Sequence, residues 1–506
     1  MKLRPLFILL AVLTLSATVR SAPGTLIPRP QEATRLDGQF VFTTGIPVVY
    51  ASGLEPLAEY IADYIPLQRL DDRTWTAGAA LRLSLDGTMD DESYRLTVTP
   101  QGVQVVGADY GGVFNGLQTL LQLLPPEVYT GQATLPLTVD ACRIEDAPRF
   151  HYRGMMLDVV RTWMDADRVK RHIDLLSHLK INKLHLLLSN DEGWRLEIKS
   201  HPELTEIGAW RGGDSPVMPV YGKWDEKYGG FYTQDEMRDL IRYAAVRNVE
   251  IIPELDLPGH SRNFARVHPE ILCDYTPDLR PTAGYDYRSV WCASREENYR
   301  LLADILGELA ALFPSEYLHI GGDEVDMSQW EKCPNCRVLM AREGMADGHA
   351  LEQYFLGRLT RILEANGKRP AVWNEAIEGG ELARSTRVHG WESVKACLDA
   401  TAKGYRTVVM PGQYFYFDMR QSPREDGHDW AAIFDAKKVY GFGFTEFSPE
   451  QMRNVEGLQG AFFSEAYVSH EPETPDYLDY MLFPRVCALA RIAWSGNAEG
   501  WDAYYE

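Results

Sequence analysis

The run His319-Ile320-Gly321-Gly322-Asp323-Glu324-Val325 holds the residues best suited to chemistry. Its two carboxyl groups are adjacent, so their mutual repulsion favours protonation of one of them. The two glycines allow the backbone to bend sharply and a ligand to approach closely. A glycosidase needs one acid that protonates the leaving oxygen and one carboxylate that stabilises positive charge. Taken alone, such a pair also fits a solvated loop or a divalent metal site.

The elements that must position this pair alternate between strand and helix from Arg149 onward. A helical stripe follows Asp165, and another helix is expected over residues 392–403, ending at Gly404. Eight buried strands with helical crossovers predict a (β/α)₈ TIM barrel over residues 149–506. An open doubly wound sheet is the alternative, but no glycine-rich phosphate loop follows the first strand. The strands are expected to begin near Gly154, Leu184, Val249, Tyr317, Pro370, Val388, Thr407 and Gly460.

Such a barrel places its chemistry at the carboxyl ends of the strands. Polar and aromatic residues follow every expected strand of this chain, which supports the assignment. They are Arg161, Asn190, Asp191, Asp256, His260, Asp323, Glu324, Trp373, Glu375, Trp391, Glu392, Tyr416, Asp418 and Glu465.

Residues 22–148 predict a small N-terminal α/β domain. Alternating apolar residues over 94–98, a turn at Gly102 and a second apolar run over 103–106 indicate a hairpin. Apolar residues at helical spacing predict a helix over 112–124, which Pro125 and Pro126 end. The segment carries no catalytic constellation, so we expect it to serve in packing.

The first 21 residues are typical of an export signal. Lys2 and Arg4 precede an apolar stretch from Leu6 to Val19, and the small residues Ser21 and Ala22 follow. We therefore expect a secreted or periplasmic protein without stable membrane insertion once the signal is removed; a retained membrane anchor is the alternative. The formal charge of −21 argues against nucleic acid and anionic membranes as partners.

Seven cysteines are scattered along the chain, too sparsely for a disulfide scaffold. Cys333 and Cys336 form a CxxC motif, but no second pair stands at zinc spacing. A zinc site would need two more ligands nearby, and the sequence suggests none. We interpret the motif as a loop disulfide or free thiols, and expect neither a metal nor another cofactor.

Several motifs together resemble those of the β-N-acetylhexosaminidases of glycoside hydrolase family twenty. The matching stretches are HIGGDEV from His319 to Val325, RGMMLD from Arg153 to Asp158, LTEIGAWR from Leu204 to Arg211, PELDLPGH from Pro253 to His260, and VWNE from Val372 to Glu375. The resemblance covers residues 150–495, and the preceding segment is similar to the small α/β domain of these enzymes.

The resemblance implies hydrolysis of a terminal, non-reducing β-linked N-acetylhexosamine (GlcNAc or GalNAc) of a glycan. The substrate's own acetamide oxygen attacks the anomeric carbon, giving an oxazolinium intermediate and net retention of configuration. By resemblance, Asp323 holds the acetamide N–H and steadies positive charge. Glu324 protonates the departing oxygen and then deprotonates the attacking water. His260 is the third residue expected in the catalytic group.

The resemblance also implies a set of residues around the sugar. Arg161 corresponds to a clamp on sugar hydroxyls, with an ion pair to Asp158 or Asp191 as the alternative. Trp373 and Trp391 correspond to walls that stack on the sugar and its acetamide.

Three further positions complete this expected sugar site. Tyr416 corresponds to the tyrosine that binds the acetamide carbonyl, with Tyr414 as a rival for that role. Asp418 and Glu465 correspond to the acids that bind outer hydroxyls.

Two positions depart from the family pattern. Asn190 occupies the place of the aspartate that usually pairs with the histidine matched by His260. Because an amide cannot stabilise an imidazolium as a carboxylate does, we expect His260 to be less readily protonated and the pH dependence of Glu324 to shift. Asp191 takes the role instead if the loop is displaced by one residue. Phe463 replaces a tryptophan, keeping an apolar wall without the N–H donor.

Three other functions remain open at this point. A glycan-binding protein on a degenerate enzyme scaffold is disfavoured because Asp323 and Glu324 are both retained. A metallohydrolase barrel typically takes an HxH pair from an early strand, which the run from His185 to Leu187 cannot supply. A narrower specificity, such as disaccharide release or cleavage beside a sulfated sugar, depends on outer loops.

Overall fold

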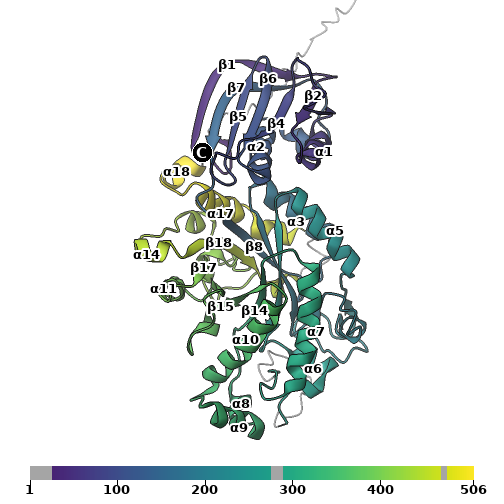
Figure 1. The fold of residues 1–506 in the computed structure, drawn as a ribbon, viewed down its shortest axis with the longest axis vertical. Helices are drawn as coiled ribbons and strands as arrows, with labels where there is room; N and C mark the ends of the chain where they lie inside the picture. The colour runs from purple at the N-terminus through teal and green to yellow at the C-terminus, as the bar shows by residue number, and fades with distance from the viewer. Residues whose placement is uncertain (1–24, 275–288, 469–475, 506) are drawn as a thin grey trace, which may run out of the picture.

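The computed structural model describes residues 25–274, 289–468 and 476–505, which form an N-terminal sheet stacked on one end of a larger barrel (Figure 1). The expected export signal lies outside these ranges. Within them, no helix is both long enough and apolar enough to cross a bilayer.

The N-terminal sheet has seven strands in the order β1-β7-β5-β6-β4-β2-β3. The expected hairpin is confirmed: β5 and β6 are antiparallel, and burial alternates along β5. The expected helix is α2, which begins at Tyr110 because the Asp109 side chain accepts from the Gly112 N–H at 2.8 Å. The elements are β1 Glu32–Phe42, β2 Pro47–Tyr50, α1 Glu55–Tyr64, β3 Gln68–Asp71, β4 Leu81–Leu85, β5 Tyr94–Thr99, β6 Gly102–Gly107, α2 Tyr110–Gln122, η2 Pro126–Thr130 and β7 Leu137–Asp146.

The second sheet is a closed barrel of eight parallel strands, which confirms the predicted TIM fold. It closes because β8 pairs with β9 on one side and with β18 on the other. Seven strands begin within two residues of the expected positions, and β18 begins five residues earlier than expected. The strands are β8 Tyr152–Asp158, β9 Lys183–Asn190, β13 Glu250–Leu257, β14 Tyr317–Gly321, β15 Arg369–Trp373, β16 Arg387–Gly390, β17 Arg406–Val409 and β18 Val455–Phe462.

Helices surround this barrel, although the crossover from β15 to β16 has only the short η4 Asn374–Ile377. The Asp165 side chain caps the N-terminus of α3, which begins at Ala166. The Ser393 side chain caps the N-terminus of α11, which begins at Val394. The main helices are α3 Ala166–His178, α5 Gln234–Val246, α7 Glu296–Leu312, α10 Gly348–Ala365, α11 Val394–Ala402, α13 Ala436–Tyr440, α14 Pro449–Met452 and α17 Arg485–Trp494.

Further elements lie in the loops at the carboxyl ends of the strands and at the end of the chain. They are β10 Gly193–Trp194, α4 Glu203–Glu206, β11 Trp210–Arg211, β12 Tyr228–Gly229, α6 Arg262–Val267, η3 Pro269–Ile271, α8 Ser328–Lys332, α9 Pro334–Glu343, α12 Gly412–Phe415, α15 Glu465–Val468, α16 Tyr477–Leu482 and α18 Trp501–Tyr505.

Charged side chains join the N-terminal sheet to the barrel. Glu92 accepts two hydrogen bonds from the buried guanidinium of Arg153 on β8, each at 2.9 Å. Asp146, at the end of β7, accepts from the indole N–H of Trp494 on α17 at 2.9 Å. These contacts hold the sheet against the barrel end opposite the loops that carry the expected chemistry, consistent with a packing role.

Candidate active site

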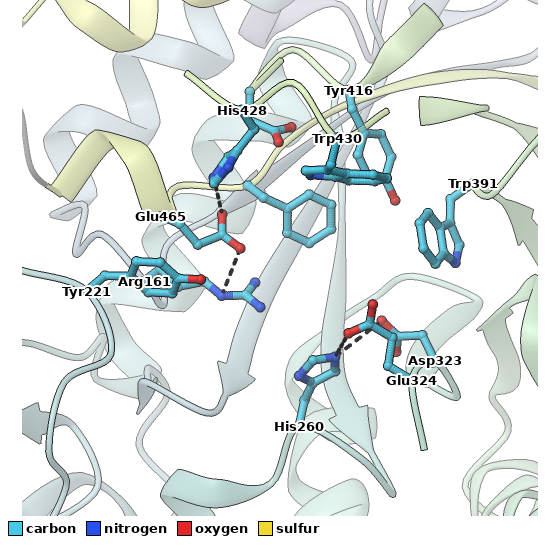
Figure 2. A pocket seen from close by; sticks show the side chains of 12 residues that line it. Arg161, Tyr221, His260, Asp323, Glu324, Trp391, Tyr416, His428, Trp430 and Glu465 are labelled. Carbon is cyan, nitrogen blue, oxygen red and sulfur yellow. Dashed lines mark ion pairs between the residues drawn. The ribbon is translucent and has the colours of Figure 1, made fainter. Parts of the chain in front are cut away.

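A cavity of ≈350 Å³ opens among the loops at the carboxyl ends of the barrel strands, as the fold requires (Figure 2). Its volume lies at the small end of ligand pockets, which span about 300–1,000 Å³. Nine of the eleven residues expected at the site line it. The full lining is Arg161, Tyr221, His260, Asp323, Glu324, Trp391, Tyr416, Asp418, His428, Trp430, Phe463 and Glu465.

The two adjacent acids leave β14 through a strained turn. Gly321 and Gly322 have φ of 73° and 94°, and Glu324 itself has a positive φ of 49°. A Cβ at Gly321 would lie 2.3 Å from Asp256 Oδ1, so only glycine fits there. The Glu324 N–H donates to Glu375 Oε2 at 3.0 Å, which fixes the strained residue. Strain retained at such a position is typical of functional sites.

Asp323 turns inward and meets a second buried acid, Asp256 at the end of β13. Burial raises the pKa of both carboxyl groups. The charge of Asp256 adds to this at Asp323, whose pKa lies well above the ordinary range, whereas at Asp256 the charge of Glu254 adds to burial and the pKa is raised to about 7. Asn190 donates to Asp256 Oδ2 at 2.8 Å. Asp323 Oδ1 is buried with no hydrogen-bond partner among the described residues, so it can accept from a ligand.

Glu324 faces the cavity with a more exposed side chain and contacts His260. Its Oε2 lies 3.2 Å from His260 Nε2, and that hydrogen bond lowers the pKa of Glu324. His260 Nδ1 lies 2.9 Å from Asp191 Oδ2. Burial opposes protonation of His260, but the charge of Asp256 and the hydrogen bonds to Asp191 and Glu324 raise its pKa well above the ordinary value.

This geometry corrects one expectation from the sequence. Asn190 is not the partner of His260; Asp191 is, so the loop follows the one-residue displacement considered as the alternative. The expectation that His260 is less readily protonated here was therefore wrong. The physical reason is that the Asn190 side chain is already held by Asp256, while the carboxylate of the next residue turns toward the imidazole.

Charged groups gather at the opposite side of the cavity from Glu324 (Figure 2). Arg161 Nε lies 3.5 Å from Glu465 Oε1, and its Nη1 lies 3.3 Å from Asp158 Oδ2, so the ion pair considered as an alternative coexists with a place in the pocket lining. Burial and the charge of Glu465 raise the pKa of Asp418 well above the ordinary range. Fixed donors and acceptors of this kind suit the hydroxyl groups of a sugar.

Aromatic rings form the apolar part of the wall. Trp391 stacks on Tyr416, with ring centroids 5.9 Å apart and planes at 14°. Tyr416 also contacts Phe463, at 5.2 Å between centroids. Tyr414 instead packs edge-on against Phe442 and is not among the lining residues, so of the two tyrosines considered it is Tyr416 that lines the cavity.

Two expected site residues do not line the cavity in this structure. Asp191 lies behind His260 and contacts its Nδ1. Trp373 is 2% exposed and packs inside the barrel against His319, at 4.5 Å between ring centroids. His319 in turn lies 3.0 Å from the buried carboxylate of Glu254. Trp373 therefore forms part of the layer of side chains under the pocket, not an exposed wall.

Sequence reasoning missed three lining residues: Tyr221, His428 and Trp430. The last two belong to the loop after β17, which also carries Tyr416, so their position after a strand was a usable signal. Trp430 is 57% exposed and meets Trp391 edge-on at 5.9 Å. Tyr221 comes from the excursion between β11 and β12, and no strand-end pattern points to it.

Asp256, His260 and Asp323 offer ligand atoms close enough together for a metal ion. However, His260 already uses both ring nitrogens, Nδ1 toward Asp191 and Nε2 toward Glu324. A ligating imidazole needs one nitrogen free for the metal. We therefore interpret these three side chains as groups that share and exchange protons, and not as metal ligands.

Models of two domain families match nearly all of the chain. Residues 150–497 match the catalytic domain of glycosyl hydrolase family 20, and residues 24–147 match domain 2 of the same family. A beta-hexosaminidase of Vibrio furnissii is 37% identical over 480 residues, covering 93% of this chain and 76% of that protein. A beta-hexosaminidase of Porphyromonas gingivalis is 33% identical, covering 94% of this chain and 61% of that protein.

Solved structures agree. An exo beta-N-acetylglucosaminidase of family 20 from Vibrio harveyi, in complex with N-acetylglucosamine, superposes with a TM-score of 0.87 at 34% identity over 96% of this chain and 76% of that one. A mutant Streptomyces plicatus beta-hexosaminidase in complex with its product GlcNAc gives a TM-score of 0.81 at 30% identity, covering 96% and 93%.

Proposed function

The chain belongs to glycosyl hydrolase family 20 and is a β-hexosaminidase, and on that premise we propose that it removes terminal, non-reducing β-linked N-acetylhexosamine from glycans with help from the substrate's own acetamide. One observation carries the mechanism: Asp323 and Glu324 are adjacent, yet one turns to a buried carboxyl partner and the other to the open cavity. Two such environments divide the acids between two tasks.

Asp323 is proposed to receive the acetamide. Its buried Oδ1 lacks a partner among the described residues and can accept the acetamide N–H. Holding that group brings the carbonyl oxygen against the anomeric carbon, so the attack becomes intramolecular. The carboxylate then stabilises the positive charge of the oxazolinium ring. Tyr416, whose ring stacks on Trp391, is proposed to donate to the acetamide oxygen.

Glu324 is proposed to protonate the leaving oxygen and later to take a proton from the water that opens the oxazolinium ring. Its hydrogen bond to His260 connects it to a strongly basic imidazole. A proton shared between the two side chains is available to the leaving group and can return after hydrolysis. Because each of the two steps inverts the anomeric carbon, the net configuration is retained.

The remaining lining residues are proposed to hold a single terminal sugar. Arg161, Asp418 and Glu465 would bind outer hydroxyls, and Trp391 and Phe463 would flank its apolar faces. The orphaned Asp418 Oδ1 and Trp391 Nε1, which have no hydrogen-bond partner among the described residues, indicate a polar ligand.

A panel of aryl glycosides tests the function. We expect hydrolysis of N-acetyl-glucosaminides or -galactosaminides, and a loss of about 10²–10⁴-fold in the Glu324→Gln variant. Equal cleavage of plain glucosides would contradict acetamide participation. Binding of N-acetylhexosamine without hydrolysis by the wild type would instead support a glycan-binding protein.

A second series tests the acetamide step directly. Replacing the acetyl hydrogens of the substrate by one, two and three fluorine atoms weakens the carbonyl oxygen as a nucleophile. We expect kcat to fall with each fluorine. A kcat independent of fluorine content would indicate a carboxylate nucleophile. That result would contradict the acetamide step but not the proposed glycosidase activity.

We further propose that the enzyme acts outside the cytoplasm. Lys2 and Arg4 before the apolar stretch from Leu6 to Val19 support this. N-terminal sequencing of the protein from its native host is expected to start near residue 22. A start at Met1 in the cytoplasmic fraction would contradict the proposal.

A further inference from the structure

Four cysteines that are far apart in the sequence meet in one buried cluster. Cys273 and Cys292 come from the connection between β13 and α7, and Cys333 and Cys336 from the connection that follows β14. All four Sγ atoms lie within 4.8 Å of one another, and each residue is at most 4% exposed. The sequence-based expectation that no further ligands stand near the CxxC motif was therefore wrong, because the fold supplies them.

The distances within the cluster fit a metal better than disulfides. Cys336 Sγ lies 3.8 Å from Cys273 Sγ and 3.6 Å from Cys292 Sγ. A disulfide needs about 2.05 Å between sulfur atoms. Four thiolates about 2.3 Å from a tetrahedral zinc ion are separated by about 3.8 Å. Cys336 thus stands at tetrahedral spacing from two partners at once, which a single disulfide cannot explain.

The surroundings favour thiolates. Cys333 is the N-cap of α9 and Cys336 lies in its first turn, where the helix dipole stabilises negative charge. The Ser294 hydroxyl lies 3.2 Å from Cys292 Sγ and 3.6 Å from Cys336 Sγ, within hydrogen-bond reach of both. Arg295 adds a positive charge nearby, with its Nε donating to the carbonyl oxygen of Leu272, the residue before Cys273.

The backbone holds the cluster in place independently of any ion. The Cys292 N–H donates to the Ile271 carbonyl oxygen at 2.8 Å. Asn298 donates to the carbonyl oxygens of both Ile271 and Cys292. The Trp330 indole on α8 donates to the carbonyl oxygen of Trp291 at 2.9 Å, joining the two connections. The sulfur atoms are thus brought together by a framework that is already hydrogen-bonded.

We propose that Cys273, Cys292, Cys333 and Cys336 bind one structural Zn²⁺ ion. A set of four thiolates with no open position is the arrangement of structural zinc sites, and it leaves no coordination site for a substrate. Binding releases the thiol protons, because thiolates are the ligands. With all four positions taken by buried residues, the ion would be closed off from solvent.

The position of this site indicates its structural role. One pair of ligands lies on the connection after β13, which carries His260, and the other pair on the connection after β14, which carries Asp323 and Glu324. The ion would fasten these two loops together behind the catalytic residues. Its contribution would be to the stability and placement of the loops, because the cluster is not part of the pocket lining.

Elemental analysis of the full-length enzyme, purified without a metal-affinity step, tests the proposal. We expect one zinc per chain. In Cys336→Ser we expect zinc to be lost and the Tm to fall by several degrees. Cys397→Ser, which alters a buried cysteine outside the cluster, should retain the full zinc content. If Cys336→Ser does not fold, the zinc content and the number of free thiols of the wild type are enough to test the proposal.

Three results would overturn the proposal. The first is a metal-free chain in which only the cysteines outside the cluster, Cys142, Cys397 and Cys487, react as free thiols under denaturing conditions, which means two disulfides. The second is a chain whose seven thiols are all free and that retains no zinc after incubation with ZnCl₂ and dialysis. The third is iron in place of zinc, detected by visible absorbance. None of these readouts depends on glycosidase activity, so the proposed function is tested separately.

Discussion

His260 Nε2 lies 3.2 Å from Glu324 Oε2, so the proposed proton donor is half of a hydrogen-bonded pair. The same imidazole contacts Asp191 through its other nitrogen at 2.9 Å. The pair keeps its proton at higher pH than an isolated carboxylic acid would, because the pKa of His260 is raised by its acidic neighbours. The pH dependence of catalysis should therefore report on this chain of three residues.

The first prediction concerns Asp191→Asn. Loss of the Asp191 carboxylate lowers the pKa of His260, so the pair loses its proton at lower pH. Because leaving-group departure requires that proton, we expect the alkaline limb of kcat/KM to move to lower pH. A pH–rate profile with an aryl N-acetylglucosaminide measures the shift, and the activity at neutral pH should fall by about tenfold or more.

Asn190→Asp is the matched control. It adds a carboxyl group one residue away but leaves the bond between Asp191 and His260 in place, so its alkaline limb should stay close to that of the wild type. The opposite result, a shift in Asn190→Asp with none in Asp191→Asn, would show that Asn190 sets the protonation of His260 after all.

The second prediction concerns Asp256→Asn. After burial, the charge of Asp256 is the main cause that raises the pKa of Asp323. Removing that charge lowers the pKa of Asp323, so the carboxylate that stabilises the oxazolinium forms at lower pH. We expect the acidic limb of the kcat profile to move to lower pH. An unmoved acidic limb would mean that ionisation of Asp323 does not limit the reaction.

The third prediction concerns Trp430→Ala. This indole is 57% exposed at the pocket mouth and meets Tyr416 edge-on at 5.7 Å, so its free face is available to a neighbouring sugar. We expect KM for an N-acetylated oligosaccharide to rise roughly 5- to 10-fold, about 1–1.4 kcal/mol, with little change in kcat. Trp224→Ala removes another exposed indole, which is 69% exposed and does not line the pocket, and should leave KM unchanged.

The fourth prediction concerns Glu92→Gln, which weakens the joint between the N-terminal sheet and the barrel. Arg153 is 1% exposed and would keep its charge without a carboxylate partner. We expect a loss of about 3–5 kcal/mol in the free energy of unfolding. Denaturant unfolding at neutral pH measures it.

The same ion pair predicts the direction in which stability changes with pH. Although burial opposes ionisation, Arg153 holds the pKa of Glu92 well below its ordinary value. The contribution of Glu92 is therefore complete above its unfolded pKa of about 4.3 and is lost as the pH falls through the folded value. Wild type should lose stability more steeply than Glu92→Gln below that pH; parallel curves would contradict this assignment.

The sequence alone determined the barrel and its direction. Each expected strand was a short apolar run followed by polar or aromatic residues, and parallel strands bring those followers to one end. Eight of the residues expected on that basis line one cavity. This worked because strand-end position is a local property, encoded within a few residues of each strand.

Only the tertiary structure decided which side chains meet. Asp191 and Asn190 are adjacent, and a one-residue difference in loop path determines which of them faces His260. The four cysteines of the proposed zinc site lie on two connections whose approach depends on neighbouring barrel strands. Local periodicity contains no information on such distances, because they are fixed by the packing of segments that are remote in sequence.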